Sequence, residues 1–476
     1  MRLLAPLLAA AAARAASAAW ALPAHAARML HAPHSAARTR AQMRRWAPAA
    51  GPAPGSRVFS PVAFGADPTG AADATAGVGA AVAALLATCG APRAALANGV
   101  RDCGGATLDL EGGTYLVSAP LVIPPGYGDL HVMQGSLLAS AAFPRARYLI
   151  EVGNATVGGA GDSIDVSLSA LFLNAGQAAG CIHTENLQGG VIGPQVYAFN
   201  FSAFGILASR GFELTIMQTW AAEFWYSDPR KENTTATGEA VGIFKDGNDG
   251  VVDDCVIFSS KIGLWVGGEA NTVSTVHTWN LARGNNGTGI LASTGQQRFS
   301  NCYLDWNDIV FTAPTRVTFT GGFFLCGARI RLVAPADGAL DGVFISGNQF
   351  IGDYCNFRGY GAVEADGVFT SVLDATVEGT LAEADIAVRG PRATLTQRAA
   401  APASSWVFNF TDSLLFDAAA VPIQAITVAL VVDDAAQAPV AVVAHKAEGG
   451  IVRVEAAAAV AGSVTVTVDQ SRRRGA

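Results

Sequence analysis

Short apolar segments recur along residues 242–350, and within each of them apolar and polar positions alternate. Five six-residue segments, at 252–257, 273–278, 299–304, 319–324 and 345–350, share this pattern, and their starts lie 21, 26, 20 and 26 residues apart. Such a period, with β-branched or aromatic segments separated by Gly and Asn, predicts a solenoid of short strands. The stretch has no amphipathic run of helical length and no fixed leucine spacing, so the pattern favours a parallel β-helix.

The alternation also predicts which side chains face the core. Strands of successive turns stack about 4.8 Å apart, so equivalent positions form columns along the solenoid axis. In each segment the first and fourth positions should point inward, the third should lie at a bend, and the second and fifth should point outward. The first expected inward column is Val252, Val273, Phe299 and Phe319, and the second is Cys255, Val276, Cys302 and Gly322. The residues expected at the bend are Asp254, Thr275 and Asn301. The first expected outward column is Asp253, Ser274, Ser300, Thr320 and Ser346, and the second is Val256, His277, Tyr303, Phe323 and Gln349.

Residues 1–26 are interpreted as a secretory signal peptide, because Arg2 precedes an apolar stretch too short to span a membrane. An organelle transit peptide is the alternative, since the leader is rich in Ala and Arg and no Asp or Glu precedes Asp67. Later segments are not long and apolar enough to predict a membrane span. Five N-glycosylation sequons favour secretion to the cell exterior or the cell wall, at Asn154, Asn200, Asn233, Asn286 and Asn409.

Residues 27–57 are rich in Ala, Arg and Pro without periodicity, which predicts a disordered linker. The β-helix is expected over 58–395, beginning with a strand, a turn and a helix capped by Asp73 or Thr75. This helix would cover the open end of the solenoid, which otherwise exposes apolar core and unpaired strand edges.

The polar stretch 227–239 interrupts the repeat and predicts a long loop beside the binding face. The period is lost towards the C-terminus, where short alternating segments predict a small β-sheet appendage over 396–476. The expected fold class is therefore all-β: a parallel β-helix solenoid with an N-terminal capping helix and a C-terminal β-sheet appendage.

Composition narrows the possible partners. Charged residues are only 14 % of the chain and 53 residues are Gly, as expected for a β-rich fold with many tight turns. The net charge of −7 argues against nucleic acid as a partner. We expect the chain to be a monomer.

The seven cysteines suggest one disulfide and no metal site. Cys89 and Cys103 flank a short loop and are the expected disulfide pair. Cys255 and Cys302 lie in one column but two turns apart, about 9–10 Å, which is too far for a disulfide. The sequence shows no Cys or His spacing typical of zinc, so we expect no metal and no cofactor.

Several stretches resemble a known family. Residues 62–70 (Val-Ala-Phe-Gly-Ala-Asp-Pro-Thr-Gly), followed by Asp73-Ala74-Thr75, resemble the entry motif of the pectate-lyase-like superfamily, whose fold is a right-handed parallel β-helix. Within it the chain is most similar to the plant quartet-type polygalacturonases, relatives of glycoside hydrolase family 28. This similarity is carried by residues 108–116, 247–259, 270–277, 301–305 and 321–325. The resemblance implies hydrolysis of α-1,4-galacturonan, an acidic polysaccharide of pectin-like walls.

The resemblance also suggests catalytic residues. Asp253 and Asp254 resemble the Asp-Asp step of family 28, and His277 follows one turn later, although in Val-His-Thr rather than Gly-His-Gly and without an Asn-x-Asp one turn before the Asp pair. Inverting hydrolysis needs a carboxylic acid and a carboxylate about 6.5–9.5 Å apart. Asp305, two turns from Asp253, is the candidate partner. Asp254 at the bend fits a structural ladder equally well.

Substrate binding is expected from an aromatic side chain and three cations. Tyr303 points outward and can stack on a sugar ring, and Arg binds carboxylates such as those of uronates bidentately. The candidate cations are Arg329, Arg331 and Lys261. Two alternatives remain open: a polysaccharide lyase of the same fold, which would need Ca²⁺ or a cationic base, and a noncatalytic cell-wall-binding β-helix.

Overall fold

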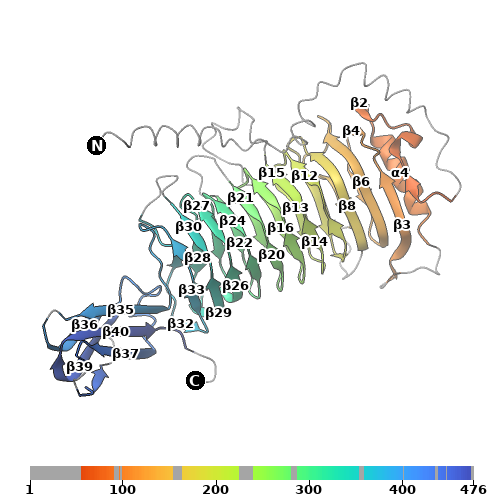
Figure 1. Cartoon of the computed structure of the whole chain (residues 1–476). Coiled ribbons are helices and arrows are strands. Elements are labelled where there is room, and N and C mark those ends of the chain that lie inside the picture. Colours follow the sequence, from red (N-terminus) through yellow and green to blue (C-terminus); the bar gives the residue numbers. More distant parts are fainter. Residues whose placement is uncertain are drawn as a thin grey trace, which may run out of the picture. The chain divides into compact units, whose positions relative to one another are not determined.

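A computed structural model gives the structure of the chain (Figure 1). It describes residues 55–90, 96, 99–153, 163–223, 240–279, 287–352, 359–399, 401–434, 438–445 and 448–472. The expected signal peptide at 1–26, all but the last three residues of the expected linker at 27–57, and the expected loop at 227–239 lie outside the described residues. Within the described part, no helix is both long enough and apolar enough to cross a membrane.

Two parallel sheets form a β-helix, as the repeat predicts. One turn consists of β16 (Val241–Lys245), β17 (Val251–Asp253) and β18 (Val256–Phe258). In the next turn, β19 (Ile262–Val266) pairs in parallel with β16, β20 (Thr272–Ser274) with β17, and β21 (His277–Trp279) with β18. The first strand of each turn belongs to one sheet, called sheet B here, and the other two belong to sheet A (Figure 1).

The other strands continue this arrangement along the axis. Sheet B also contains β5 (Leu121–Ile123), β7 (Tyr148–Val152), β9 (Gly180–Glu185), β13 (Phe204–Ser209), β22 (Thr288–Ala292), β25 (Asp308–Phe311), β28 (Ile330–Val333) and β31 (Val363–Asp366). Sheet A also contains β1 (Val58–Phe59), β2 (Thr69–Asp73), β3 (Arg101–Asp109), β4 (Thr114–Val117), β6 (Tyr127–Ala139), β8 (Ser163–Asn174), β10 (Leu187–Gln188), β11 (Val191–Ile192), β12 (Val196–Phe199), β14 (Thr215–Met217), β15 (Thr219–Ala222), β23 (Arg298–Ser300), β24 (Tyr303–Asp305), β26 (Thr315–Thr320), β27 (Phe323–Leu325), β29 (Ala339–Ser346), β30 (Gln349–Ile351), β32 (Ser371–Leu373), β33 (Thr376–Glu378) and β34 (Leu381–Ala382).

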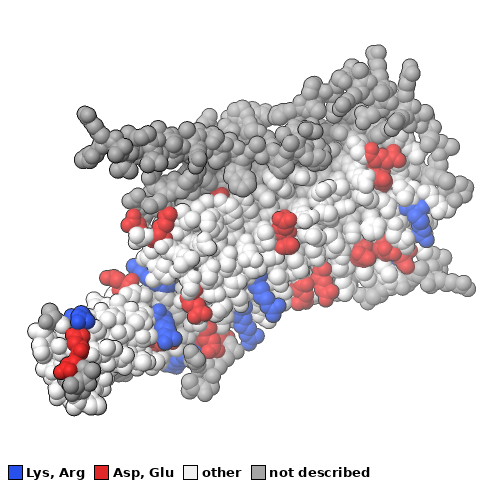
Figure 2. Space-filling view, in the orientation of Figure 1, with Lys and Arg blue, Asp and Glu red and all other residues white. Residues whose placement is uncertain are grey.

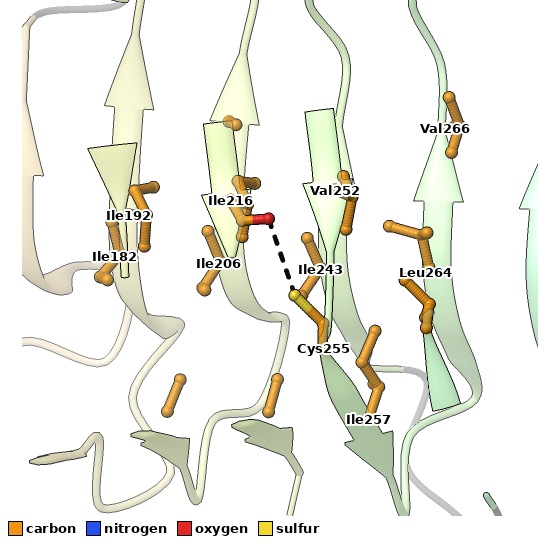
Figure 3. Packing of buried hydrophobic residues seen from close by; sticks show 14 of the residues in the cluster. Ile182, Ile192, Ile206, Ile216, Ile243, Val252, Cys255, Ile257, Leu264 and Val266 are labelled. Carbon is orange, nitrogen blue, oxygen red and sulfur yellow. Dashed lines mark hydrogen bonds between the residues drawn. The ribbon is translucent and has the colours of Figure 1, made fainter. Parts of the chain in front are cut away.

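The predicted inward columns are confirmed. Val252 pairs with Val273, Val273 with Phe299, and Phe299 with Phe319, and all four are at most 1 % exposed. The second column is buried as well; in it Cys255 lies against the carbonyl oxygen of Ile216, with a sulfur–oxygen distance of 3.8 Å (Figure 3). The core is therefore a stack of matched apolar layers, one from each turn.

The predicted bend residues are confirmed too. Asp254, Thr275 and Asn301 have φ values of 50°, 55° and 53°, and Gly321 has 66° at the equivalent position. This left-handed conformation turns the chain between the two strands of sheet A, and Asn, Asp and Gly tolerate it best.

The helix α4 (Thr75–Ala87) follows a short 3₁₀ helix at Pro61–Phe64 and lies beside β3 at the N-terminal end of the solenoid (Figure 1). Its apolar residues Val78, Ala81 and Leu85 belong to the β-helix core, so it covers the first turn as expected. The expected cap was wrong: the N-cap is Ala74, because Asp73 ends strand β2. The Asp73 carboxylate instead accepts a hydrogen bond from the backbone N–H of Thr75.

The structure contains the expected disulfide between Cys89 and Cys103, which joins the end of α4 to β3. Among the described residues, Cys181, Cys255 and Cys302 are free and buried. Cys326 is disulfide-bonded, a role that its sequence surroundings do not indicate.

The C-terminal part is antiparallel. Its first sheet contains β35 (Arg392–Arg398), β40 (Gly462–Asp469) and β37 (Ala425–Val432), and its second contains β36 (Ala403–Asn409), β39 (Ile451–Val460) and β38 (Val442–Ala444). A separate core that includes Phe408 and Val466 lies between them. The expected boundary between 395 and 396 falls inside β35.

Candidate functional site

The outer face of sheet B changes from apolar to charged residues along the β-helix axis. In the pairing register, Trp265 of β19 is followed by Leu291, Val310, Arg331 and Glu364 on successive strands. The outward column is thus apolar over three strands and charged over the last two. Sheet B ends with β31, so the charged part lies at the C-terminal end of this face.

Five charged side chains meet there, and we call them the β25–β31 cluster: Asp308, Arg329, Arg331, Glu364 and Asp366. The Nη1 atom of Arg329 lies 2.9 Å from Oε1 of Glu364, and Nε of Arg331 lies 2.7 Å from Oδ2 of Asp366. The guanidinium of Arg329 also lies over the ring of Tyr360, at 5.6 Å from its centroid. Both arginines are therefore held in fixed orientations.

The arginine side chains hold Asp308 less tightly than the other two carboxylates, although its Oδ1 accepts a hydrogen bond of 3.2 Å from the backbone N–H of Arg329. Its oxygens lie 3.6 Å from Nε of Arg329 and 3.8 Å from Nη1 of Arg331, and its side chain is 21 % exposed. Burial raises the pKa of Asp308 to about 6, and the two arginines only partly offset this effect. A carboxyl group with a pKa near 6 can carry a proton in mild acid and still donate it, as a general acid requires.

Two of the four expected catalytic residues lie together on sheet A. Nε2 of His277 is 3.3 Å from Oδ2 of Asp305, and the His277 ring stacks on Tyr303 at a centroid distance of 4.3 Å. Asp305 is 8 % exposed, and its other oxygen, Oδ1, has no hydrogen-bond partner in the described structure. The Tyr303 ring also contacts Phe323, so its neighbours on the outer face cover much of it.

The other two expected residues lie in the other row of sheet A strands. Asp253 on β17 accepts a hydrogen bond of 2.5 Å from Ser274, and Asp254 occupies the bend. Among the interactions of the described residues, none joins either aspartate to His277 or Asp305. Lys261, an expected substrate ligand, lies just before β19 and is partly exposed.

The β25–β31 cluster lies one corner away from the His277–Asp305 pair. Asp305 ends β24 and Asp308 begins β25, so at most about 11 Å separates their Cα atoms. Sequence reasoning singled out Arg329 and Arg331 but missed the three carboxylates around them. The available signal was the charge at the start of two successive sheet-B segments, Asp308 before Ile309-Val310 and Arg329 before Ile330-Arg331, where the three preceding turns have Gly242, Gly263 and Gly289.

Known proteins were compared with the chain. No family model matches it. Polygalacturonase QRT3 of Arabidopsis thaliana is 33 % identical over 429 residues, which cover 88 % of this chain and 85 % of the relative. The chain belongs to the family of QRT3-like polygalacturonases.

The fold of this QRT3-like chain is similar to that of one solved virus protein. ORF18 of Geobacillus virus E2 superimposes with a TM-score of 0.51 at 9 % identity, covering 90 % of this chain and 80 % of that one. The A-module of the mannuronan C-5 epimerase AlgE4 of Azotobacter vinelandii gives a TM-score of 0.42 at 14 % identity, covering 70 % and 100 %. At 9 % identity the likeness to ORF18 concerns the fold alone.

Among the described residues of this QRT3-like chain, no group of three or more His, Cys, Asp or Glu side chains is arranged to hold a metal ion. Figure 2 shows one face, on which charged residues are sparse and both signs are interspersed.

Two of the five sequons can be placed. Asn409 is exposed, and its side-chain oxygen accepts hydrogen bonds from the backbone N–H and the hydroxyl of Thr411. Asn200 is partly exposed, and its side-chain amide donates to Asn174. Asn154, Asn233 and Asn286 lie outside the described residues.

Proposed function

We propose that this chain is a secreted glycoside hydrolase that cleaves a galacturonan-type polysaccharide of the cell wall. Kinship with polygalacturonase QRT3 supports the substrate class. The observation that carries the assignment of the site is Asp308, a largely buried carboxyl group with a pKa of about 6 beside two arginines and two further carboxylates.

In this proposal Asp308 is the general acid and Glu364 the general base. Both carboxylates contact the guanidinium of Arg329, Asp308 at 3.6 Å from Nε and Glu364 at 2.9 Å from Nη1. Their nearest oxygens therefore lie within about 9 Å of each other, which is compatible with the separation of about 6.5–9.5 Å that lets a water molecule enter between the carboxyl groups of an inverting enzyme. The water oxygen attacks the anomeric carbon and gives its proton to Glu364. The glycosidic bond breaks, and Asp308 protonates the leaving oxygen.

Arg329 and Arg331 bind the carboxylate of the sugar at the cleavage point. A guanidinium group has five N–H donors, and the contacts with Glu364 and Asp366 use only some of them. An arginine held by a carboxylate behind it can still offer its remaining donors to a uronate. A galacturonan chain is therefore preferred over a neutral glucan.

A reducing-end assay on polygalacturonate, with absorbance of unsaturated products read in parallel, tests this proposal. We expect new reducing ends without that absorbance, and a loss of about 10²–10⁴-fold for Asp308→Asn, the range typical of a general acid. Absorbance would instead identify a lyase, and binding without turnover would identify a wall-binding protein.

The sequence-based assignment to Asp253, Asp254, His277 and Asp305 is the rival proposal for the site. The variants Asp253→Asn and Asp305→Asn separate the two in the same assay. If they abolish turnover while Asp308→Asn keeps it, the site belongs on sheet A rather than on sheet B.

A further inference from the structure

A second charged group lies on the outer face of sheet B, towards its N-terminal end. Glu185 ends β9 and is 4 % exposed. Its Oε1 atom contacts Nε and Nη2 of Arg210, the residue that follows β13. Its Oε2 atom lies 3.3 Å from Nε2 of His183, which also lies 3.4 Å from the hydroxyl of Ser209.

The Glu185 carboxylate is buried, so its contact with Arg210 is not an ordinary surface ion pair. A buried carboxylate is costly unless charged partners and hydrogen bonds compensate it, and here it is almost completely covered. The Arg210 side chain remains 47 % exposed. Glu185 thus holds the inner edge of the guanidinium, and the donors that this contact does not use are available at the outer side.

Arg210 and the β25–β31 cluster belong to one continuous sheet. The strands β13, β16, β19, β22, β25 and β28 follow one another, so Arg210 and Arg331 lie five spacings of about 4.8 Å, or about 24 Å, apart along the axis. The register places Arg331 level with Leu207, so Arg210 also lies three residues, or about 10 Å, to one side. The outward column that leads from β13 to Arg331 contains Phe244, Trp265, Leu291 and Val310. An elongated ligand that crosses this face obliquely would contact both charged groups.

The aromatic part of this column is not itself a platform for a sugar ring. Phe244 and Trp265 stack on each other at 4.5 Å, with an angle of 24° between their planes. Since they belong to successive strands, their faces point along the axis and their edges point outward. Recognition along this face therefore depends on its charged ends.

We propose that Arg210 is a distal binding site for a carboxylate of the same acidic polysaccharide chain that occupies Arg329 and Arg331. This inference rests on the proposed function, because it assumes that the substrate is a polyuronate lying along sheet B. A polyuronate carries a carboxylate on every sugar, so one chain can occupy both arginine sites. Asp246, which follows β16, is a further carboxylate near Arg210, and its burial raises its pKa and so lowers its negative charge in mild acid.

Oligogalacturonides of graded length test the inference. The main variant is the double substitution Arg210→Ala with Glu185→Gln, which avoids leaving a buried carboxylate without its partner. For chains long enough to span both sites we expect KM to rise about tenfold, as for the loss of one charge-assisted hydrogen-bonded contact, with kcat unchanged. For the shortest substrates that are cleaved, KM should not change.

Two further variants control the experiment. Arg210→Lys keeps the charge but loses the bidentate geometry, so it should give an intermediate KM without leaving Glu185 unpaired. Arg398→Ala removes another arginine of a carboxylate pair, that with Asp433 in the C-terminal sheets, and should change KM for no substrate. Thermal melting of each variant checks that it is folded.

Calorimetric titration separates this inference from the proposed function. If the wild-type chain binds long oligogalacturonides without cleaving them, the hydrolase proposal fails but the distal site is still tested by the affinities. Weaker binding of long oligomers by the double variant supports the site, and a parallel titration with alginate oligomers shows whether it distinguishes between uronates. Equal affinities of wild type and double variant, or no binding by the wild type, overturn the inference.

Discussion

Two residues of the same type on sheet B, Asp308 and Asp366, differ in their surroundings. Asp308 and Asp366 are both carboxylates near Arg331, but only Asp366 is hydrogen-bonded to it. Asp308 is covered without such a bond, and so its pKa is raised. This difference gives the site one carboxyl group that can carry a proton beside others held in ion pairs.

Asp308→Asn should stabilise the folded chain at neutral pH. The pKa of Asp308 is about 6 when folded and close to 3.8 when exposed, so the folded state binds more protons between these values. Wild-type stability therefore falls as the pH rises through this window. Each pKa unit corresponds to about 1.4 kcal/mol, so ionised Asp308 costs about 3 kcal/mol at pH 7 and almost nothing at pH 4.

Urea unfolding of wild type and Asp308→Asn at pH 4 and pH 7 measures this effect. We expect the variant to gain up to about 3 kcal/mol relative to wild type between the two pH values. An advantage that is the same at both pH values would contradict the raised pKa.

The same group should control the pH dependence of turnover. If Asp308 must be protonated to act as the acid, kcat should fall about tenfold per pH unit above its pKa in the enzyme–substrate complex. In the free enzyme this pKa is about 6, and kcat/KM should fall likewise above it. A rate profile on polygalacturonate from pH 4 to 8 checks this, and undiminished kcat/KM at pH 8 would remove Asp308 from the acid role.

At the scale of strands and turns, the sequence predicts what is local. Alternation within a strand and the left-handed bend both depend on neighbouring residues. The inward column that begins at Val252 and the bend position of Asp254 were therefore predicted correctly. The β25–β31 cluster depends instead on register between turns that differ in length. Asp308 pairs with Thr288 at an irregularity in the ladder, which no fixed repeat predicts. Its raised pKa also depends on surrounding atoms that the sequence pattern does not describe.

The inward column should be far more sensitive to truncation than the outward one. Phe319 is fully buried and packs against Phe299 and Phe324, with ring centroids at 6.0 and 5.5 Å. Phe319→Ala should lower the free energy of unfolding by about 3–5 kcal/mol, because it leaves a cavity in the stack. Phe323→Ala in the same turn is the matched control, since that ring lies on the outer face, and its loss should cost clearly less. Equal losses, measured by urea unfolding, would contradict the assignment of the two faces.

At the scale of the whole molecule, the C-terminal sheets and the β-helix are joined by specific hydrogen bonds. Gln470 follows β40 and is 1 % exposed. Its side-chain amide donates to the carbonyl oxygens of Phe416 and Val421, and its side-chain oxygen accepts from the N–H of Phe416. Phe416 and Val421 belong to the β-helix core cluster, although they lie between strands of the appendage in sequence. This connection suggests that the two parts unfold together.

Gln470→Ala should therefore destabilise both parts. It leaves two carbonyl groups and one N–H without this partner in a buried place, and each such group costs about 1–3 kcal/mol. We expect a loss of about 2–4 kcal/mol in a single unfolding transition. Gln424→Ala is the matched control, at an exposed glutamine that donates to the carbonyl oxygen of Pro422 and accepts from the exposed side chain of Arg472. It should change stability by less than about 0.5 kcal/mol. Circular dichroism during urea unfolding measures both variants. A single transition at lower urea is expected for Gln470→Ala, and unchanged stability would show that these hydrogen bonds do not join the two parts.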